Sequence, residues 1–393
     1  MKILRIIVSM NPESGGPSQG IRNSISEMKK LGVENEAVCF DSTCYMDCND
    51  FIIHTLGDGK TAWNYNKKLI PFLLKNFHRF EAVIVHGLWQ YHSYAAVRAW
   101  KKYKKANKIY PKLFIMPHGM LDPYFQRAKE RRLKAVRNWV YWKFIENKTV
   151  NSADGILFTC EEELRLAREP FKPYKPKQEL NVNYGIQSPP CFSEKYTMAF
   201  TEKNPAWNGK PFILFLSRIH EKKGVDLLIN AYCKLQTDFK NIPQLVIAGP
   251  AESEYAKKMK KLAENNADIL FAGMLNGDAK WGAFYSCECF ILPSHQENFG
   301  IAIVEAMACG KPVLITDKVN IWREIAGENA GFVGEDTEKS TVNMLKKWFS
   351  LSSEEKCEMQ KNALRAYQKY FSIEQSAEKF INALKISNKL EFM

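Results

Sequence analysis

Short apolar runs rich in β-branched and aromatic residues recur along the chain, and each is followed by a segment with helical periodicity. Strands that are apolar along their whole length are buried on both faces, which is typical of parallel sheets covered by helices on each side. We therefore predict an α/β fold with doubly wound parallel sheets. The predicted strands are Ile3–Met10, Glu36–Phe40, Ala82–His86, Leu113–Pro117, Gly155–Cys160, Asn181–Tyr184, Phe212–Ser217, Gln244–Ala248, Ile269–Ala272, Cys289–Pro293 and Pro312–Thr316.

A stretch without periodicity, which contains Pro and Gly, divides this series of strands in two. A chain of 393 residues is long enough for two domains. We predict two Rossmann-like domains, with a C-terminal helix that packs back on the N-terminal domain. The predicted boundaries are 1–187 for the N-terminal domain, 188–209 for the linker, 210–370 for the C-terminal domain and 371–393 for the last helix.

Composition limits the class of protein. The ten cysteines show no regular spacing in a chain far longer than the small domains that need disulfides, so we expect free thiols and no metal site. The first residues lack a signal-peptide pattern, and no apolar run approaches the roughly 20 residues that span a bilayer. We expect a cytoplasmic protein.

The positive charge of the chain is concentrated in one segment, residues 98–148. This segment holds fifteen Lys or Arg against three acidic residues, a net charge of +12, whereas the whole chain carries +13. Mixed with Trp and Tyr, such charge suits an anionic membrane surface, although a solvated pair of helices is the alternative. No recognition motif for nucleic acid accompanies it, and we expect no nucleic-acid partner.

Three features of the first half follow predicted strands, where ligands of open α/β sheets bind. Gly15-Gly16 opens a helix, and paired glycines at a helix N-terminus suit an anion, with a simple tight turn as an equal alternative. His118 can hydrogen-bond a sugar hydroxyl or a carbonyl, but a lone histidine is more often structural. His86 follows the preceding strand and should line the same cleft.

In the second half, Arg218 and Lys223 lie on a short loop between a strand and a helix. Two cations at a strand end are suited to a diphosphate, and the alternative is a solvated loop.

The segment with the strongest signal runs from Leu292 to Gly310. A polar loop carries Glu297, and a helix starts near Phe299 and Gly300, where its N–H groups are free for a phosphate. Glu305 lies about two turns into this helix among apolar neighbours, where a carboxylate is costly unless it is paired or binds a ligand. Vicinal ribose hydroxyls would suit Glu305 as donors, and an ordinary surface Glu is the alternative.

The spacing of Glu297 and Glu305 resembles the E-x7-E signature of retaining GT-B glycosyltransferases of family 4. Ala306–Val313 after the second Glu agrees with that family. Ser217-Arg218 followed by Glu221–Gly224 resembles its Arg/Lys diphosphate motif.

The first half is similar to the same family. Gly15-Gly16 resembles its N-terminal glycine loop, and Pro117–Pro123 resembles a subgroup that builds bacterial exopolysaccharide, capsule or O-antigen. Asn183-Tyr184-Gly185 stands where the family often has Pro-Asn-Gly, so a polar contact from the middle position is expected to be lost. The resemblance covers nearly the whole chain and implies two Rossmann-like domains facing across a cleft.

The resemblance also implies a role for each candidate residue. Arg218 and Lys223 would neutralise the donor diphosphate, and Glu305 would hold the ribose. His118 and Glu297 would lie at the donor sugar. The implied catalytic residues are His118, Arg218, Lys223 and Glu297; donor binding adds Gly15, Gly16, Asn298, Phe299, Gly300 and Glu305; the acceptor side has Gly16, His86 and His118.

A retaining transfer from a nucleotide-diphosphate sugar is the reaction that this resemblance implies. The acceptor would be a saccharide or a polyprenyl-diphosphate-linked saccharide at the inner face of the membrane. No cofactor and no metal are expected, since Arg218 and Lys223 supply the charge. The alternatives are another GT-B enzyme, such as a nucleotide-sugar hydrolysing epimerase or a sucrose or glycogen synthase, and a non-catalytic sugar-nucleotide binder. An NAD-dependent oxidoreductase would need a glycine fingerprint that is absent after the first strand.

Overall fold

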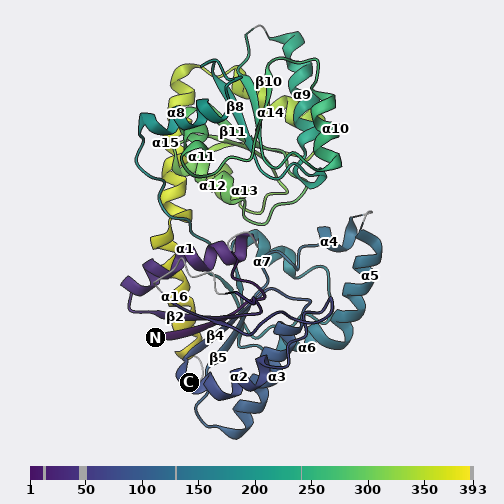
Figure 1. Cartoon of the computed structure of the whole chain (residues 1–393), viewed down its shortest axis with the longest axis vertical. Helices are drawn as coiled ribbons and strands as arrows, with labels where there is room; N and C mark the ends of the chain where they lie inside the picture. Colours follow the sequence, from purple (N-terminus) through teal and green to yellow (C-terminus); the bar gives the residue numbers. More distant parts are fainter. Residues whose placement is uncertain (12–14, 44–50, 129–130, 240, 390–393) are drawn as a thin grey trace. The chain divides into compact units, whose positions relative to one another are not determined.

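The computed structural model describes residues 1–11, 15–43, 51–128, 131–239 and 241–389. The chain divides into two compact units, and each is built on its own sheet (Figure 1). Unit 1 comprises Met1–Gly185 and Ile373–Met393, and unit 2 comprises Ile186–Ser372. All strand pairs within both sheets are parallel, so the predicted α/β class is confirmed.

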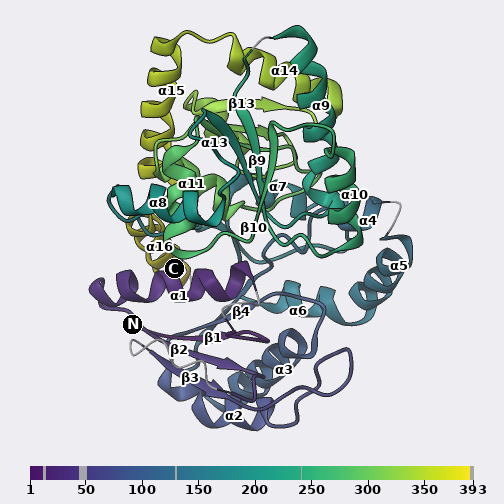
Figure 2. The same cartoon turned by 45° about the horizontal axis from the view of Figure 1, so that its top comes forward.

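The sheet of unit 1 has seven strands in the order β3-β2-β1-β4-β5-β6-β7. Figure 2 shows β1, β2 and β3 as neighbours. The order reverses between β1 and β4, and such a switch point is where open α/β sheets bind ligands. The strands are β1 (Lys2–Ile6), β2 (Glu34–Cys39), β3 (Ile52–Thr55), β4 (Ala82–His86), β5 (Lys112–Met116), β6 (Gly155–Phe158) and β7 (Glu179–Asn181).

Helices cover both faces of this sheet because its strands are apolar on both sides. The last helix, α16, lies beside α1, where Phe380 and Leu384 pack in one core cluster with Met28 (Figure 1). The helices are α1 (Gly16–Lys30), α2 (Leu69–Asn76), α3 (Tyr91–Ala106), α4 (Tyr124–Arg127), α5 (Arg132–Tyr141), α6 (Asn147–Ser152), α7 (Glu161–Ala167) and α16 (Ile373–Lys389), with a π-helical turn at Trp142–Glu146.

Unit 2 has a six-stranded sheet in the order β10-β9-β8-β11-β12-β13, which reverses between β8 and β11. Its strands are β8 (Phe212–Leu216), β9 (Gln244–Ala248), β10 (Ile269–Gly273), β11 (Cys289–Leu292), β12 (Val313–Thr316) and β13 (Gly331–Gly334). Its helices are α8 (Glu194–Lys203), α9 (Val225–Asp238), α10 (Glu254–Leu262), α11 (Gly277–Ser286), α12 (Ile301–Ala308), α13 (Trp322–Gly327), α14 (Glu338–Phe349) and α15 (Ser353–Ala366), with a 3-10 turn at Glu221–Lys223.

The structure differs from the sequence-based boundaries in several places. The sequence analysis missed the edge strands β3 and β13, which are four residues long. The third difference is β7, which ends at Asn181, where the predicted strand begins. Residues 188–209 were predicted as a linker, but they belong to unit 2 and contain α8, which packs tightly on α11: a Cβ on Gly282 would lie 2.0 Å from the carbonyl oxygen of Tyr196.

A close backbone contact joins the loops that follow β8 and β11. Gly224 has φ 65°, and a Cβ built on it would lie 2.0 Å from the carbonyl oxygen of Pro293. The backbone N–H of His295 donates to the carbonyl of Lys222 at 2.9 Å. Only glycine allows this approach, so position 224 fixes the distance between the two loops.

Unit 1 buries the carboxyl group of Glu146, which forms no salt bridge with any residue described. Glu146, at the end of the π-helical turn, has 0% exposed surface. Burial raises the pKa of Glu146 to about 8. The side chain is therefore largely protonated at neutral pH.

Glu146→Gln should change how the stability of unit 1 depends on pH. Between the ordinary pKa of Glu and about 8, the folded state binds a proton that the unfolded state lacks, so the free energy of unfolding falls as pH rises. One proton gives a slope of at most about 1.4 kcal/mol per pH unit. Urea unfolding at pH 5.5 and 7.5 should show a smaller decline in the variant. The exposed Glu34→Gln serves as control, and parallel declines in all three proteins would contradict the assignment.

Gly224→Ala should destabilise unit 2 more than Gly209→Ala. Both glycines have positive φ, so both substitutions carry the strain of left-handed backbone, about 1–2 kcal/mol. Only a Cβ at 224 meets another atom, because nothing lies within 4 Å of a Cβ at 209. Overpacking adds about 1–3 kcal/mol, which urea unfolding would measure as the difference between the variants. Equal losses would show that the contact with Pro293 is not tight.

Candidate active site

Unit 2 brings two predicted site residues into direct contact at its switch point. Lys223 ends the 3-10 turn after β8, and Glu297 lies on the loop after β11. The Nζ atom of Lys223 forms a salt bridge with Oε2 of Glu297. The side chain of Lys223 is 7% exposed and that of Glu297 is 23% exposed, so the pair is largely shielded from water.

The surroundings of Glu297 stabilise its charged form. Burial alone would raise the pKa of this carboxyl, but the charge and hydrogen bond of Lys223 outweigh burial, and the pKa is lowered. The backbone N–H of Asn298 donates to Oε1 of Glu297 at 3.0 Å. The backbone of Glu297 is bonded on both sides to the loop after β12, to the carbonyl of Lys318 and the N–H of Asn320, each at 2.9 Å. Glu297 is thus an anion held in a fixed position.

Arg218 lies on the same loop as Lys223 but in a different environment. Its side chain is exposed, and it forms no salt bridge with any residue that the structure describes. The switch point of unit 2 therefore presents one buried, paired cation and one exposed cation that is available to an anionic ligand.

The helix α12 begins directly after this loop. Gly300 adopts φ 77° as its N-cap, and Phe299 is buried against Phe371 with ring centroids 5.8 Å apart. Glu305 is on α12 with its side chain 15% exposed, and its Oε1 accepts a hydrogen bond from Lys280 Nζ at 2.7 Å. The sequence predicted that Glu305 is either paired or binds a ligand. The structure shows that it is paired with Lys280, and its contact with a ribose stays a prediction.

Unit 1 brings its two predicted histidines together at the ends of β4 and β5. His86 Nδ1 lies 2.9 Å from His118 Nε2, and the two rings stack with centroids 5.1 Å apart. His118 adopts φ 52°, and the next residue, Gly119, donates its N–H to the buried carboxylate of Glu163. Burial is the main cause that lowers the pKa of His118 to about 3. Both rings are therefore neutral at physiological pH.

The glycine loop of unit 1 is described from Gly15 onward, and residues 12–14 lie outside the described part. Gly15 has φ 100° and caps α1. The carbonyl oxygen of Gly16 accepts a hydrogen bond from the hydroxyl of Tyr184 at 2.6 Å. The middle position of Asn183-Tyr184-Gly185 was expected to lose its polar contact, and this is wrong, because the tyrosine hydroxyl reaches across to α1.

Sequence reasoning missed three residues of these sites. Lys280 pairs with Glu305 from α11, and Glu163 fixes the loop after β5 from α7. The third is Arg5, the fourth of the five residues of β1, and its charge between the apolar residues Leu4 and Ile6 was the available signal.

The described part of the chain contains no group of three or more His, Cys, Asp or Glu side chains that could hold a metal ion, and its eight cysteines are free thiols. Cys44 and Cys48 lie outside the described residues. None of the described helices has the length and apolar character needed to cross a bilayer.

Comparison with known proteins relates this chain to sugar transferases. Residues 199–366 match the family described as Glycosyl transferases group 1. The serotype-specific mannosyltransferase WbdA of Escherichia coli is 30% identical over 131 residues, 32% of this chain and 16% of WbdA. The N-acetylgalactosamine-N,N'-diacetylbacillosaminyl-diphospho-undecaprenol 4-alpha-N-acetylgalactosaminyltransferase of Campylobacter jejuni is 34% identical over 139 residues, 34% of this chain and 36% of that enzyme. The chain thus spans only about a sixth to a third of the length of these two relatives.

A likeness to solved structures extends over the whole chain. The Anabaena protein Alr3699/HepE, in its crystal structure in complex with UDP-glucose, aligns with a TM-score of 0.74 at 15% identity and covers 98% of this chain and 100% of that one. The two-domain fold that the sequence resemblance implied is therefore confirmed. Residues 199–366, which match the Glycosyl transferases group 1 family, carry Arg218, Lys223, Glu297 and Glu305.

Proposed function

We propose that this chain is a retaining glycosyltransferase that moves a sugar from a nucleotide-diphosphate sugar to a lipid-linked saccharide in cell-surface polysaccharide biosynthesis. The observation that carries the proposal is the Lys223–Glu297 pair at the switch point of a group 1 domain, with the exposed Arg218 on the same loop. The names of the relatives support the substrate classes: HepE was crystallised with UDP-glucose, and the Campylobacter enzyme is named for a diphospho-undecaprenol acceptor.

In this proposal, the bond between the anomeric carbon and the diphosphate oxygen breaks, and its electron pair stays on the diphosphate. A new bond forms from the same carbon to the acceptor hydroxyl oxygen, and the departing diphosphate takes up the hydroxyl proton. Negative charge therefore develops on the diphosphate. Preorganised cations that face developing charge lower the barrier most.

Arg218 and Lys223 divide this task. Lys223 has three N–H donors and uses one of them on Glu297, so it can also donate to a phosphate oxygen while the carboxylate holds it in place. Arg218 can form two parallel hydrogen bonds to phosphate oxygens. The two cations supply the charge that a divalent metal would otherwise provide, and we propose that transfer needs no metal.

Arg218→Met should lower transfer while leaving the fold intact. The exposed guanidinium has no salt bridge to lose among the described residues, so the midpoint of thermal unfolding should not change. Loss of one charge-stabilising donor costs roughly 100-fold to 1,000-fold in rate. The measurement is transfer from a panel of UDP-, GDP- and ADP-sugars to a diphospho-lipid acceptor with and without EDTA. Lys257→Met, which removes an exposed cation on α10, is the control.

Three outcomes would contradict the proposal. Equal rates for Arg218→Met and the control would remove Arg218 from the site. Loss of the wild-type rate in EDTA would show a metal requirement. Hydrolysis of the donor at the same rate with and without acceptor would indicate a nucleotide-sugar hydrolase.

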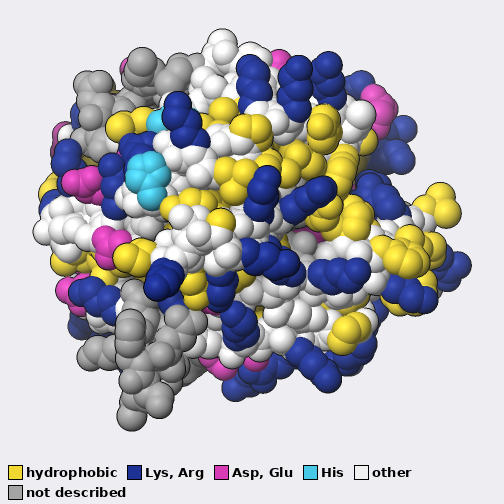
Figure 3. Space-filling view, turned by 90° about the horizontal axis from the view of Figure 1, so that it is seen from below, with side chains coloured by type: hydrophobic (Ala, Val, Ile, Leu, Met, Phe, Trp, Pro, Cys, Tyr) yellow, Lys and Arg dark blue, Asp and Glu magenta, His cyan; other side chains and the backbone are white. Residues whose placement is uncertain are grey.

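The acceptor side of the proposal includes contact with an anionic membrane through the basic segment 98–148. Figure 3 shows a face of the molecule with many more Lys and Arg side chains than Asp and Glu, and with hydrophobic side chains between them. On α5 and the turn after it, the hydrophobic side chains Leu133, Val136, Val140 and Phe144 are exposed, with Leu133 at 89%. Their spacing of three or four residues places them along one helix face. Exposed cations flank this stripe: Arg132, Lys134, Arg137 and Lys143.

An apolar stripe flanked by cations suits a helix that lies in the membrane interface, with its apolar side chains among the lipid tails and its cations at anionic headgroups. Lys143 also lies over the ring of the exposed Trp139, 5.3 Å from its centroid, and indole rings favour the headgroup level.

Replacing Leu133, Val136 and Phe144 by Ser should weaken binding to vesicles that contain phosphatidylglycerol. The transfer rate to a water-soluble acceptor should stay within twofold, because these side chains are exposed and not part of the core. Vesicle sedimentation would measure the change, with the exposed Met198→Ser and Leu262→Ser of unit 2 as control. Unchanged sedimentation of the triple variant would rule out this face as the membrane contact.

A further inference from the structure

Unit 1 buries an arginine that has no carboxylate partner among the described residues. Arg5, the fourth of the five residues of β1, is 3% exposed. Its Nε donates to Asn35 Oδ1 at 2.9 Å, and its Nη2 donates to Met28 Sδ at 3.1 Å. The guanidinium also lies 5.0 Å from the ring centroid of Phe380. Burial lowers the pKa of Arg5 to about 10, so it stays charged at neutral pH.

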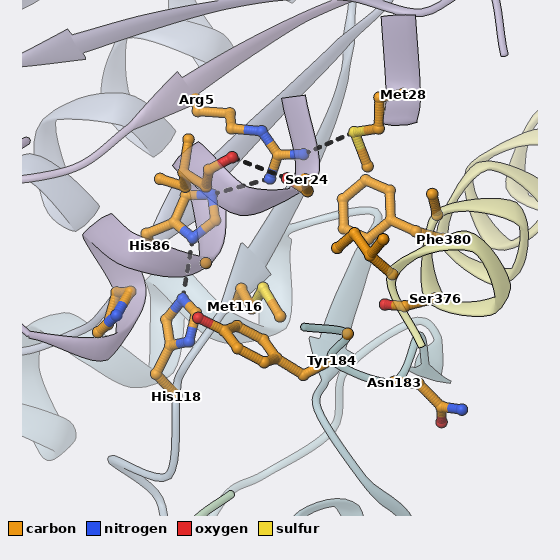
Figure 4. Close-up of a pocket in the computed structure, with 16 residues that line it drawn as sticks. Arg5, Ser24, Met28, His86, Met116, His118, Asn183, Tyr184, Ser376 and Phe380 are labelled. Carbon is orange, nitrogen blue, oxygen red and sulfur yellow. Dashed lines mark hydrogen bonds between the residues drawn. The ribbon is translucent and has the colours of Figure 1, made fainter. Parts of the chain in front are cut away.

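A buried cation without a counterion is costly, and apolar packing alone gives no reason for it. The remaining contact of Arg5 supplies one. Its Nη1 lies 3.4 Å from His86 Nε2, and His86 in turn contacts His118 (Figure 4). Arg5, His86 and His118 thus form a continuous series of contacts from the interior of the sheet to the loop after β5.

The chemistry of these groups fixes the donor-to-acceptor direction of the hydrogen bonds that join Arg5, His86 and His118. A guanidinium only donates hydrogen bonds, so His86 Nε2 must accept and carries no proton. A neutral His86 then has its proton on Nδ1 and donates it to His118 Nε2, 2.9 Å away. His118 Nε2 therefore accepts, and a neutral His118 has its proton on Nδ1.

The surroundings of both rings favour the neutral forms. Burial lowers the pKa of His86 well below its ordinary value, and the nearby His118, Arg5 and His92 lower it further. For His118, burial acts first and the charge of Arg5 second. His92 on α3, with its Nε2 2.9 Å from the carbonyl oxygen of His86, is itself kept neutral by burial.

Two further groups face this region from other elements. The carboxylate of Glu163 on α7 is already engaged by the N–H of Gly119 and by Thr159. The hydroxyl of Tyr184 donates to Gly16. Beside them lies a cavity of about 30 Å³, room for roughly one water, which His118, Tyr184, Ser376 and Phe380 help to line (Figure 4).

We propose that Arg5, acting through His86, is a positioning residue that fixes His118 as a neutral imidazole with its proton on Nδ1. His118 then serves the reaction as a permanent hydrogen-bond donor to a substrate oxygen and takes no part as an acid or a base. The contact of His118 with substrate rests on the proposed function, whereas its protonated nitrogen follows from the contacts within unit 1.

The first test uses the wild-type chain and needs no activity. Long-range ¹H–¹⁵N spectra of the protein labelled in histidine distinguish the two tautomers and the cation, and loss of one signal set in His118→Gln assigns the residue. We expect the Nδ1–H tautomer alone from pH 5.5 to 8. A proton on Nε2, or a cationic ring at pH 6, would overturn the proposal even if the chain transfers sugar.

Variants then test whether Arg5 and His86 are the cause. Without the donor of Arg5, His86 can take either tautomer, so Arg5→Met should give a mixture of His118 tautomers and lower kcat about tenfold, with KM for the donor within twofold. Arg5→Lys keeps a buried donor and should restore the single tautomer. A single Nδ1–H tautomer and an unchanged kcat in Arg5→Met would show that Arg5 does not act on His118 through His86.

A second pair of variants decides the matter if Arg5→Met fails to fold. In His86→Gln the amide oxygen can accept from Arg5 and the amide nitrogen can donate to His118, so the single tautomer should persist. In His86→Leu the donor to His118 is absent, and the mixture should appear. The same His118 spectrum in both variants would overturn the proposal that Arg5 acts on His118 through His86. Should the wild-type chain transfer no sugar, the proposed function fails, while the spectra still decide the tautomer.

Discussion

The salt bridge between Lys223 and Glu297 is the interaction on which the site of unit 2 depends, and it exists because two loops meet at the switch point of a parallel sheet. Largely burying either charge alone would cost several kcal/mol, so each group offsets the cost of burying the other. The contact requires the backbone at 224 to lie against Pro293, which a side chain would prevent. The close backbone contact at Gly224 therefore brings the two loops together, and the ion pair between them holds the ammonium group of Lys223 in a fixed position.

The two units solve the problem of placing polar groups at a sheet edge in different ways. In unit 2 opposite charges neutralise each other, and Glu305 follows the same rule with Lys280. In unit 1 the groups near the switch point are neutral rings, ordered by one buried guanidinium. A paired cation suits a substrate that carries charge, and a neutral donor suits an oxygen of a sugar or an acceptor. This difference agrees with a reaction in which charge develops on the diphosphate.

Much of the fold and several contacts of the site could be predicted from the sequence, and the failures have physical causes. Central strands such as β4 and β8 have at least four consecutive apolar residues and therefore stand out, whereas the edge strands β3 and β13 are short and less buried. The helix α8 was missed because its flanking Pro and Gly residues suggested a linker. His86 and His118 were placed at one cleft because parallel strands end together. The partners Lys280 and Glu163 come from helices whose distance along the chain gives no signal.

Arg5 and Arg218 show why the type of residue alone does not reveal a role. Arg218 lies on an exposed loop, where a guanidinium costs little and remains available to an anion. Arg5 lies in an inner strand of a sheet, where, among the residues described, neutral acceptors and the ring of Phe380 oppose the desolvation of its charge. The cost of burying such a charge is offset where its hydrogen-bond donors order the neighbouring groups. In unit 1 the guanidinium of Arg5 orders two histidines. Because a guanidinium can only donate hydrogen bonds, it fixes which nitrogen of each ring carries the proton.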